Sequence, residues 1–209
     1  MPSSAYRTFS ENMGTVDRLL ESYIELKELH NPEHKRGRVA LDHITRSATI
    51  FLVSTFEVYI EDILLETVNI NIRYAHNFIN LPVDIQNMLR RATNRYPTEK
   101  WIQKYRRLVK EETDELNTPK IYKIQNLFEK YLAVPSTDIN AIPNSSDINP
   151  IIIKRGKIVH TVKSVQYVKY EEVISDKESI FGFVTEVDNF LALNIKATYP
   201  NLRMPWNRI

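Results

Sequence analysis

The sequence predicts an all-α fold, a helical bundle with one long central helix. Two observations support this prediction. Apolar residues recur at intervals of three and four over most of the chain, which is the period of an amphipathic helix. One segment, from about Arg38 to Ile79, is apolar on two sides, which is typical of a helix that other helices surround.

Length and composition indicate one globular domain. The chain has 209 residues, of which 43% are hydrophobic and 26% charged, so it is long enough for one substantial core. We expect a single domain over residues 1–209, with its core at about 10–197. The net charge of +2 is small, so any affinity for a polyanion must depend on where the charges lie.

Several classes of protein are excluded or disfavoured. The chain has no cysteine, which excludes disulfides, zinc-thiolate sites and thiol nucleophiles. No dinucleotide or P-loop glycine motif occurs, and Pro32 separates His30 from His34, so we expect no cofactor and no metal site. The N-terminus lacks a signal or transit pattern, and no window has the roughly 18 apolar residues of a membrane span. We therefore expect a cytoplasmic protein without a membrane partner.

Helix boundaries follow from breakers and caps. A first amphipathic helix is expected from Ser10 to His30, and the central helix follows it. Proline and cap positions predict three further helices over about 82–96, 98–116 and 119–131.

The last third of the chain is less regular. Residues 133–150 are rich in turn formers and predict the longest loop. Residues 162–175 have a strand-like composition, and we expect an irregular tail over 198–209. A closing amphipathic helix precedes this tail, with these residues on one face: Ile180, Val184, Val187, Leu191 and Ile195.

The stretch IIIKRGKIVH, residues 151–160, is the strongest candidate site. Pro150 predicts a helix start here. Arg155 and His160 then point about 140° apart and are separated by about 7.5 Å along the axis. Arginine stabilises charge on phosphate oxygens and histidine moves protons near neutral pH, so the pair suits phosphodiester cleavage. The alternative is a solvated arginine and a partly buried core histidine.

Three further features add candidates. Lys154 and Lys157 flank Arg155 as possible RNA contacts. Glu57 interrupts an apolar stripe of the central helix, and it either orients Arg155 or His160 as part of the catalytic site or pairs with a surface lysine at the rim.

A basic stretch over residues 89–110, interleaved with aromatic residues, suits phosphate contacts and base stacking. The alternative is a solvated helical face whose Trp101 and Tyr105 pack inward. The RNA-binding candidates in this stretch are Arg90, Arg91, Arg95, Lys104, Arg106 and Arg107.

Three segments of the chain carry a resemblance to a known family. They are RGKIVH at the start of a late helix, RSATIFLVSTFEVYIEDILLE at 46–66 and EEVISDKESIFGFVTEVDNFLALNI at 171–195. The chain resembles the HEPN family (higher eukaryotes and prokaryotes nucleotide-binding domains), specifically its RiboL-PSP-HEPN and defence-associated branches. The resemblance covers most of residues 38–197 and implies a HEPN-like helical bundle. Gly156 stands where the family most often has a polar residue such as asparagine.

The resemblance implies a metal-independent endoribonuclease in a toxin–antitoxin or phage-defence role. In this mechanism the RNA 2′-hydroxyl attacks the adjacent phosphate and leaves a 2′,3′-cyclic phosphate, with Arg155 stabilising charge and His160 transferring protons. RNA, with tRNA as one candidate, would be the substrate, and an antitoxin or defence protein a further partner. The alternatives are a catalytically silent nucleotide-binding, RNA-binding or dimerising scaffold, and a helical protein without a nucleic-acid role.

The divergence of Arg155 from His160 leaves the site of one chain incomplete. Two copies of this helix packed about a two-fold axis would bring both arginines and both histidines into one cleft. The resemblance also implies dimers of this kind, so we expect a homodimer.

Overall fold

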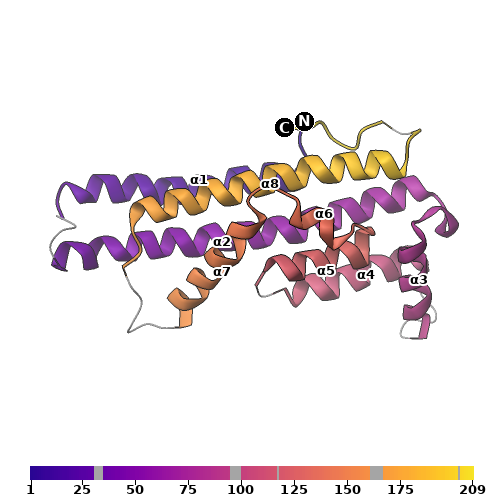
Figure 1. Ribbon diagram of the computed structural model, residues 1–209, viewed down its shortest axis with the longest axis horizontal. Helices are drawn as coiled ribbons and strands as arrows, with labels where there is room; N and C mark the ends of the chain where they lie inside the picture. Colours follow the sequence, from indigo (N-terminus) through magenta and orange to yellow (C-terminus); the bar gives the residue numbers. More distant parts are fainter. Residues whose placement is uncertain (31–34, 95–99, 117, 161–166, 202) are drawn as a thin grey trace.

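Long helices laid side by side dominate the computed structural model of the chain (Figure 1). The structure describes residues 1–30, 35–94, 100–116, 118–160, 167–201 and 203–209. The helices in these ranges are α1 Ser4–Lys27, α2 Lys35–Ala75, α3 Val83–Arg91, α4 Trp101–Asp114, α5 Ile121–Leu132, α6 Ser136–Asn140, α7 Ser145–His160 and α8 Tyr170–Thr198. Two short 3₁₀ turns, Phe78–Asn80 and Ala92–Asn94, flank α3. The described part of the chain contains no strand, so the predicted all-α class is confirmed.

The central position of α2 is confirmed. This 41-residue helix packs against α1 and α8 and also contacts α4, α5 and α7. In Figure 1, α1, α2 and α8 run along the long axis, and α3, α4, α5 and α7 gather on one side of α2. The buried apolar residues of all these helices form one continuous cluster.

A cap that the sequence analysis missed starts α1 at Ser4, six residues before the predicted start. The Ser3 hydroxyl accepts a hydrogen bond from the Tyr6 N–H and donates to the carboxylate of Asp188 on α8. The Glu66 carboxylate of α2 accepts the N–H groups of Ser4 and Ala5. Acceptors at the first free N–H groups stabilise a helix start, so these contacts fix α1 against both long neighbours.

The tail after α8 is irregular, as predicted, yet it is packed onto the bundle. Trp206 is buried, and its indole N–H donates to the Asp188 carbonyl at 3.1 Å. The Ile209 N–H donates to the Asn189 side chain, and the Asn207 N–H donates to the Met1 carbonyl. Both ends of the chain are thereby held against the middle of α8.

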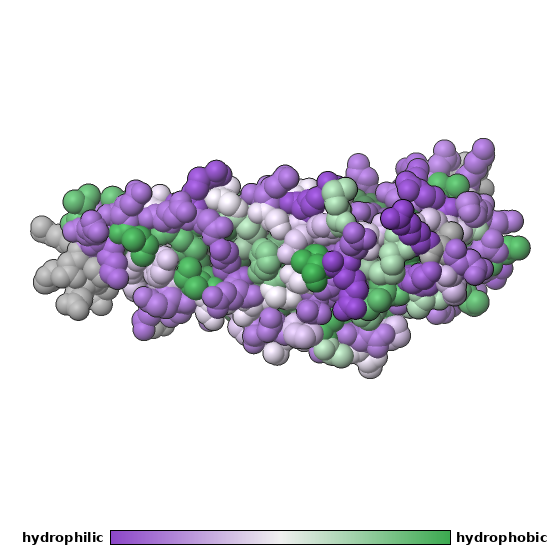
Figure 2. All heavy atoms as spheres, turned by 90° about the horizontal axis from the view of Figure 1, so that it is seen from above, coloured by the Kyte–Doolittle hydropathy of each residue, from purple (hydrophilic) through white to green (hydrophobic). Residues whose placement is uncertain are grey.

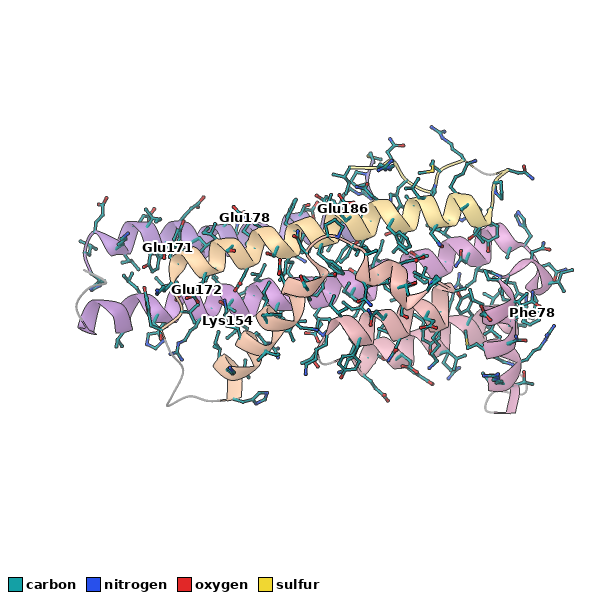
Figure 3. The ribbon with its side chains drawn as sticks, in the orientation of Figure 1. Phe78, Lys154, Glu171, Glu172, Glu178 and Glu186 are labelled. Carbon is teal, nitrogen blue, oxygen red and sulfur yellow. The ribbon has the colours of Figure 1, made fainter. Side chains whose placement is uncertain are left out.

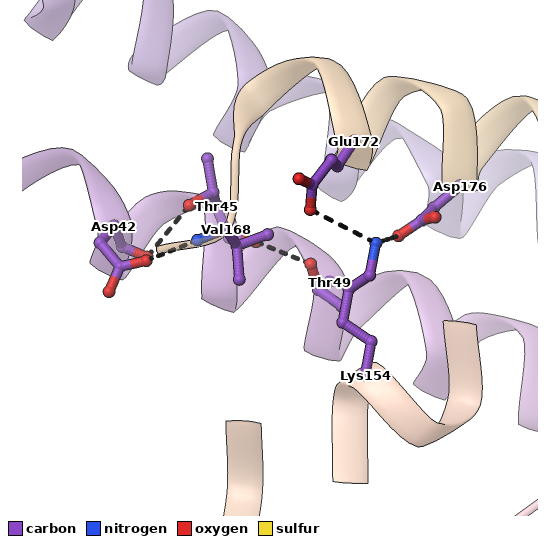
Figure 4. Close-up of polar contacts among 7 residues, drawn as sticks. All are labelled: Asp42, Thr45, Thr49, Lys154, Val168, Glu172 and Asp176. Carbon is purple, nitrogen blue, oxygen red and sulfur yellow. Dashed lines mark hydrogen bonds and ion pairs between the residues drawn. The ribbon is translucent and has the colours of Figure 1, made fainter. Parts of the chain in front are cut away.

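Figure 4 shows how the segment before α8 is attached to α2. The Asp42 carboxylate accepts the Val168 N–H at 3.1 Å and forms an ion pair with Arg46 one turn later. The Thr45 hydroxyl donates to the Asp42 carbonyl, and Thr49 donates to the Thr45 carbonyl in the same way. These contacts position the start of α8 beside the first half of α2.

The prediction of a long loop over 133–150 is wrong. This region contains α6 and the first six residues of α7, which begins at Ser145, so Pro150 lies inside the helix and not near its first position. Pro150 is exposed, so the carbonyl left without its N–H can face solvent. The turn before α7 uses Asn144 in the left-handed region, at φ 63°, and Gly182 of α8 leaves room for its side chain.

The strand-like prediction over 162–175 is also wrong where it can be compared. Residues 170–175 form the first turns of α8, whose N-terminal turn carries Glu171 and Glu172. Carboxylates at this position are favoured by the helix dipole. Residues 162–166 lie outside the described part of the chain.

The remaining helix boundaries differ from the predicted ones by a few residues: α2 begins earlier than predicted, at Lys35, and α5 ends one residue later, at Leu132. The first and central helices end at Lys27 and Ala75, and α3, α4 and α5 begin at Val83, Trp101 and Ile121. Thr98, the predicted cap of the fourth helix, lies outside the described residues. The five apolar residues chosen for the closing helix are all buried, which confirms its core face.

The face over α1 and α8 is mostly hydrophilic, with apolar side chains in small separate spots (Figure 2). Within the described ranges, no helix combines the length and apolar character that crossing a membrane requires.

We predict that Ser3→Ala lowers the free energy of unfolding by about 1–2 kcal/mol, because it removes the α1 cap. The loss should be larger at pH 8 than at pH 5. Burial raises the pKa of Asp188 to about 6, and the Ser3 bonds oppose this rise. Asp188 therefore stabilises the fold most at low pH, and its contribution falls as the pH rises through about 6.

Urea unfolding at both pH values checks this prediction, with Ser4→Ala as a control because the exposed Ser4 bonds to Glu66 only through its backbone. Equal losses for Ser3→Ala at the two pH values would contradict the assigned role of Asp188.

Candidate functional site

Arg155 lies at the centre of the inward face of α7. At about 100° per residue, it falls in the middle of the arc of the buried isoleucines. These are Ile148, Ile151, Ile152 and Ile158. Arg155 itself is half-buried, and its Nε is shielded from solvent and has no hydrogen-bond partner. A guanidinium is rarely placed among core residues without a charge partner.

Glu57 of α2 is the nearby carboxylate. Partial burial raises the pKa of Glu57, while Arg155 and then Lys123 lower it. The three charged side chains come from α2, α7 and α5, which pack against one another. Glu57 therefore interacts electrostatically with Arg155, which is what one of the two interpretations of the sequence expected, and also with a lysine.

Lys123 is the residue that the sequence analysis missed. It lies in the first turn of α5, half-buried, with its ammonium donating to the Thr118 hydroxyl at 3.1 Å. The Asn149 side chain of α7 accepts the N–H of Ile121 at 3.0 Å, which joins the start of α5 to α7. The sequence gives only a weak signal for Lys123, because a single lysine at a helix start does not reveal which residues of other helices it will contact.

A second carboxylate lies one turn beyond Glu57. Burial, and then the neighbouring charges of Glu57, Asp62 and Asp114, raise the pKa of Glu61 to about 6. This side of α2 therefore presents two carboxylates that ionise less readily than free ones, next to two cations. Such a group of titratable residues with shifted pKa values is common at functional sites.

His160 is the last residue of α7 and is exposed. Since α7 is continuous from Arg155 to His160, the predicted divergence of about 140° holds. The alternative interpretation of the sequence expected a solvated arginine and a partly buried core histidine. In the structure the arginine is half-buried and the histidine is exposed. One chain presents the two groups on different sides of α7.

Lys154 differs from its neighbour Lys157. The Lys154 ammonium bonds Asp176 at 2.7 Å and lies 3.7 Å from Glu172, which ties α7 to α8 (Figures 3 and 4). Two carboxylates already neutralise this cation, so the expected RNA contact by Lys154 is disfavoured. Lys157 is exposed on the outward side of α7 and stays a candidate.

Gly156 lies toward the outward side of α7, and a methyl group added there would meet no atom within 4 Å. Packing therefore does not require glycine at this position.

The basic stretch is only partly available to a ligand. Arg90, Arg91, Arg106 and Arg107 are exposed, and Arg95 lies outside the described residues. Lys104 as an RNA contact is wrong: its side chain is buried at 6% exposure and donates to Thr93 at 3.1 Å. It shares the inward face of α4 with Tyr105 and Leu108, so its stem is covered.

The aromatic residues of this stretch pack inward, as the alternative interpretation expected. Tyr105 is fully buried, and its hydroxyl donates to the Tyr131 carbonyl. Trp101 is half-buried and makes an edge contact with Phe78, with 6.4 Å between the ring centres. Base stacking on Tyr105 is therefore excluded.

Across the described ranges, no group of three or more histidine, aspartate or glutamate side chains is arranged to hold a metal ion.

We predict that Glu61→Gln raises the melting temperature at pH 7.5, by on the order of 1 °C after solvent screening, and has little effect near pH 4.5. The raised pKa of Glu61 means that its carboxyl stabilises the fold below about 4.5 and loses this contribution as the pH rises through about 6. Glutamine cannot ionise and keeps the neutral state. Thermal melts at both pH values check this.

Glu178→Gln is the control, because Glu178 is exposed on α8 (Figure 3). A destabilised Glu61→Gln protein at pH 7.5 would show that the Glu61 carboxylate is instead held by an attractive contact.

Comparison with protein-family models gives one result that covers this site. The model described as RiboL-PSP-HEPN matches residues 17–193, which include Glu57, Lys123, Arg155 and His160. A comparison with curated proteins and one with solved structures each found no match. HEPN domains are often ribonucleases, so the match indicates a nuclease or RNA-related role. With most of its length matched, the chain belongs to the RiboL-PSP-HEPN family.

Proposed function

We propose that this protein is a metal-independent endoribonuclease. The observation that carries the proposal is the structure of α7, in which the half-buried Arg155 lies among the buried isoleucines with its Nε shielded from solvent, and His160 is exposed at the helix end. The family match supports an RNA substrate.

The reaction needs a charge stabiliser and a proton carrier. The 2′-hydroxyl oxygen bonds to phosphorus as its proton leaves, the bond to the 5′-oxygen breaks, and that oxygen takes up a proton. Arg155 stabilises the negative charge that develops on the phosphate oxygens, and His160 transfers a proton. Glu57 holds the guanidinium in place, so its role is to position Arg155.

The complete site is shared by two copies of the chain. Because Arg155 and His160 face different sides of α7, we infer that Arg155 of one copy acts with His160 of a second copy. The exposed apolar side chain of Ile153, which is 47% exposed and lies about 20° from His160 around α7, supports such an interface.

RNA approaches along the side of α2 that carries α3, α4 and α7. This side holds the exposed arginines of the basic stretch. The outer face of α8 carries exposed glutamates and repels phosphate (Figure 3). These are Glu171, Glu178 and Glu186.

The activity of such a ribonuclease must be controlled in the cell that makes it, because that cell contains RNA substrates. A toxin–antitoxin or phage-defence role, with a partner protein that controls the activity, is therefore part of the proposal. tRNA is the first substrate to test.

We predict that Arg155→Ala and His160→Ala each reduce RNA cleavage about 100-fold or more, because each removes a transition-state charge contact or a proton carrier. The measurement is cleavage of total tRNA in EDTA, with end analysis for 2′,3′-cyclic phosphate and 5′-hydroxyl groups. Arg7→Ala is the control, since it removes an exposed cation on α1 that belongs to no part of the proposed site.

Wild-type rates in either variant would reject the assignment of that residue. Arg155→Lys helps to separate chemistry from folding, because it keeps the charge on the inward face but loses the planar guanidinium.

We predict that charge reversal of Arg106 and Arg107 weakens RNA binding and lowers the slope of log K against log salt by about 0.7 for each lost phosphate contact. Both residues are exposed on α4, although Arg106 also donates to Asn69 at 2.9 Å. Reversal of Arg7 and Arg18 on α1 gives the same change in charge as a control. Equal salt slopes for the two double variants would show that the basic stretch is a solvated helical face that does not contact RNA phosphates.

One observation favours the second candidate, a silent scaffold that binds RNA or nucleotide. Arg155 is close to Glu57 and half-buried, so the carboxylate competes with a phosphate for the guanidinium. RNA retention without cleavage by the wild-type protein would favour this alternative.

A further inference from the structure

Lys123 occupies a position that helix stability does not explain. The first turn of α5 contains no acidic residue, and Lys123 follows Lys120, the cap residue, within that turn. The positive end of a helix dipole disfavours cations and favours anions. Two lysines at this end therefore raise the local positive potential.

The same end of α5 is fixed against the candidate site. The Asn149 side chain joins α7 to Ile121, and Thr118 accepts a hydrogen bond from the Lys123 ammonium. α5 and α7 pack against each other and both pack against α2, so Lys123, Arg155 and Glu57 come from three helices in mutual contact. Both cations act electrostatically on Glu57. The buried Nε of Arg155, without a hydrogen-bond partner, is an independent sign that this group of charges is not internally satisfied.

We propose that Lys123 binds the same RNA phosphate as Arg155, as a second cation supplied by α5. The proposal rests on the RNA-related role proposed above. Lysine acts as a point charge, whereas arginine gives a planar pair of donors, so Arg155 orients the phosphate and Lys123 adds attraction. Glu57 offsets the repulsion between the two cations, and the RNA phosphate binds both of them while Glu57 still positions Arg155.

The test uses an RNA oligonucleotide with 2′-O-methyl groups, which presents phosphates but lacks the attacking hydroxyl. We expect Lys123→Gln to weaken its binding about 10-fold and to lower the salt slope by about 0.7, as loss of one single-strand phosphate contact does. Lys123→Arg should restore most of the affinity, because it keeps the charge.

Lys130→Gln is the matched control. Lys130 lies two turns later on α5, at i+7, and pairs with Glu112, so the charge change is the same but the residue is directed to another partner. We expect its affinity to stay within about twofold of wild type, since exposed ion pairs contribute little. Equal effects of Lys123→Gln and Lys130→Gln would overturn the proposal.

A second measurement needs no variant. Amine acetylation of the wild-type protein, mapped by mass spectrometry, should show Lys123 protected by the bound oligonucleotide and Lys130 unprotected. Equal labelling of Lys123 with and without oligonucleotide would overturn the proposal even if the variants do not fold.

The two proposals fail in different ways. Binding that depends on Lys123, with no cleavage of unmodified RNA, would support the phosphate site and reject the ribonuclease. Cleavage of unmodified RNA, with no effect of Lys123→Gln on binding, would support the ribonuclease and reject the phosphate site at Lys123.

Discussion

The approach of Arg155 to Glu57 between α7 and α2 is the interaction on which the site depends. It places a guanidinium at the centre of a helix face that is otherwise built from isoleucine. A charge in this position is costly without a partner, so the carboxylate and the arginine keep each other half-buried. The consequence is that Arg155 is fixed by α2, while His160 at the end of α7 is free to meet a second copy.

The long helices make this arrangement possible. Since α2 packs against α1 and α8 along its length, its remaining side can hold α4, α5 and α7 in one row. Lys154 joins α7 to α8, and Asn149 joins α7 to α5. Together with its packing against α2, these contacts fix the orientation of α7 and so the side on which Arg155 lies. The site is therefore a product of the whole bundle and not of the motif alone.

The fold class, the central helix and the divergence of Arg155 from His160 could be predicted, because each follows from helical periodicity. Glu57 stood out because it interrupts an apolar stripe. The start of α7 was missed because the residues that form turns in 133–150 also cap helices, and Pro150 is tolerated on an exposed side. Lys123 and the burial of Lys104 depend on packing between helices that local sequence does not encode.

The most direct test of the shared site is to mix Arg155→Ala and His160→Ala chains after subunit exchange and to measure RNA cleavage. Each mixed dimer would contain one site with both groups intact, and random exchange makes about half of the dimers mixed. The account predicts recovery of roughly a quarter of wild-type activity. No recovery, with mixed dimers shown to be present by mass spectrometry, would contradict it.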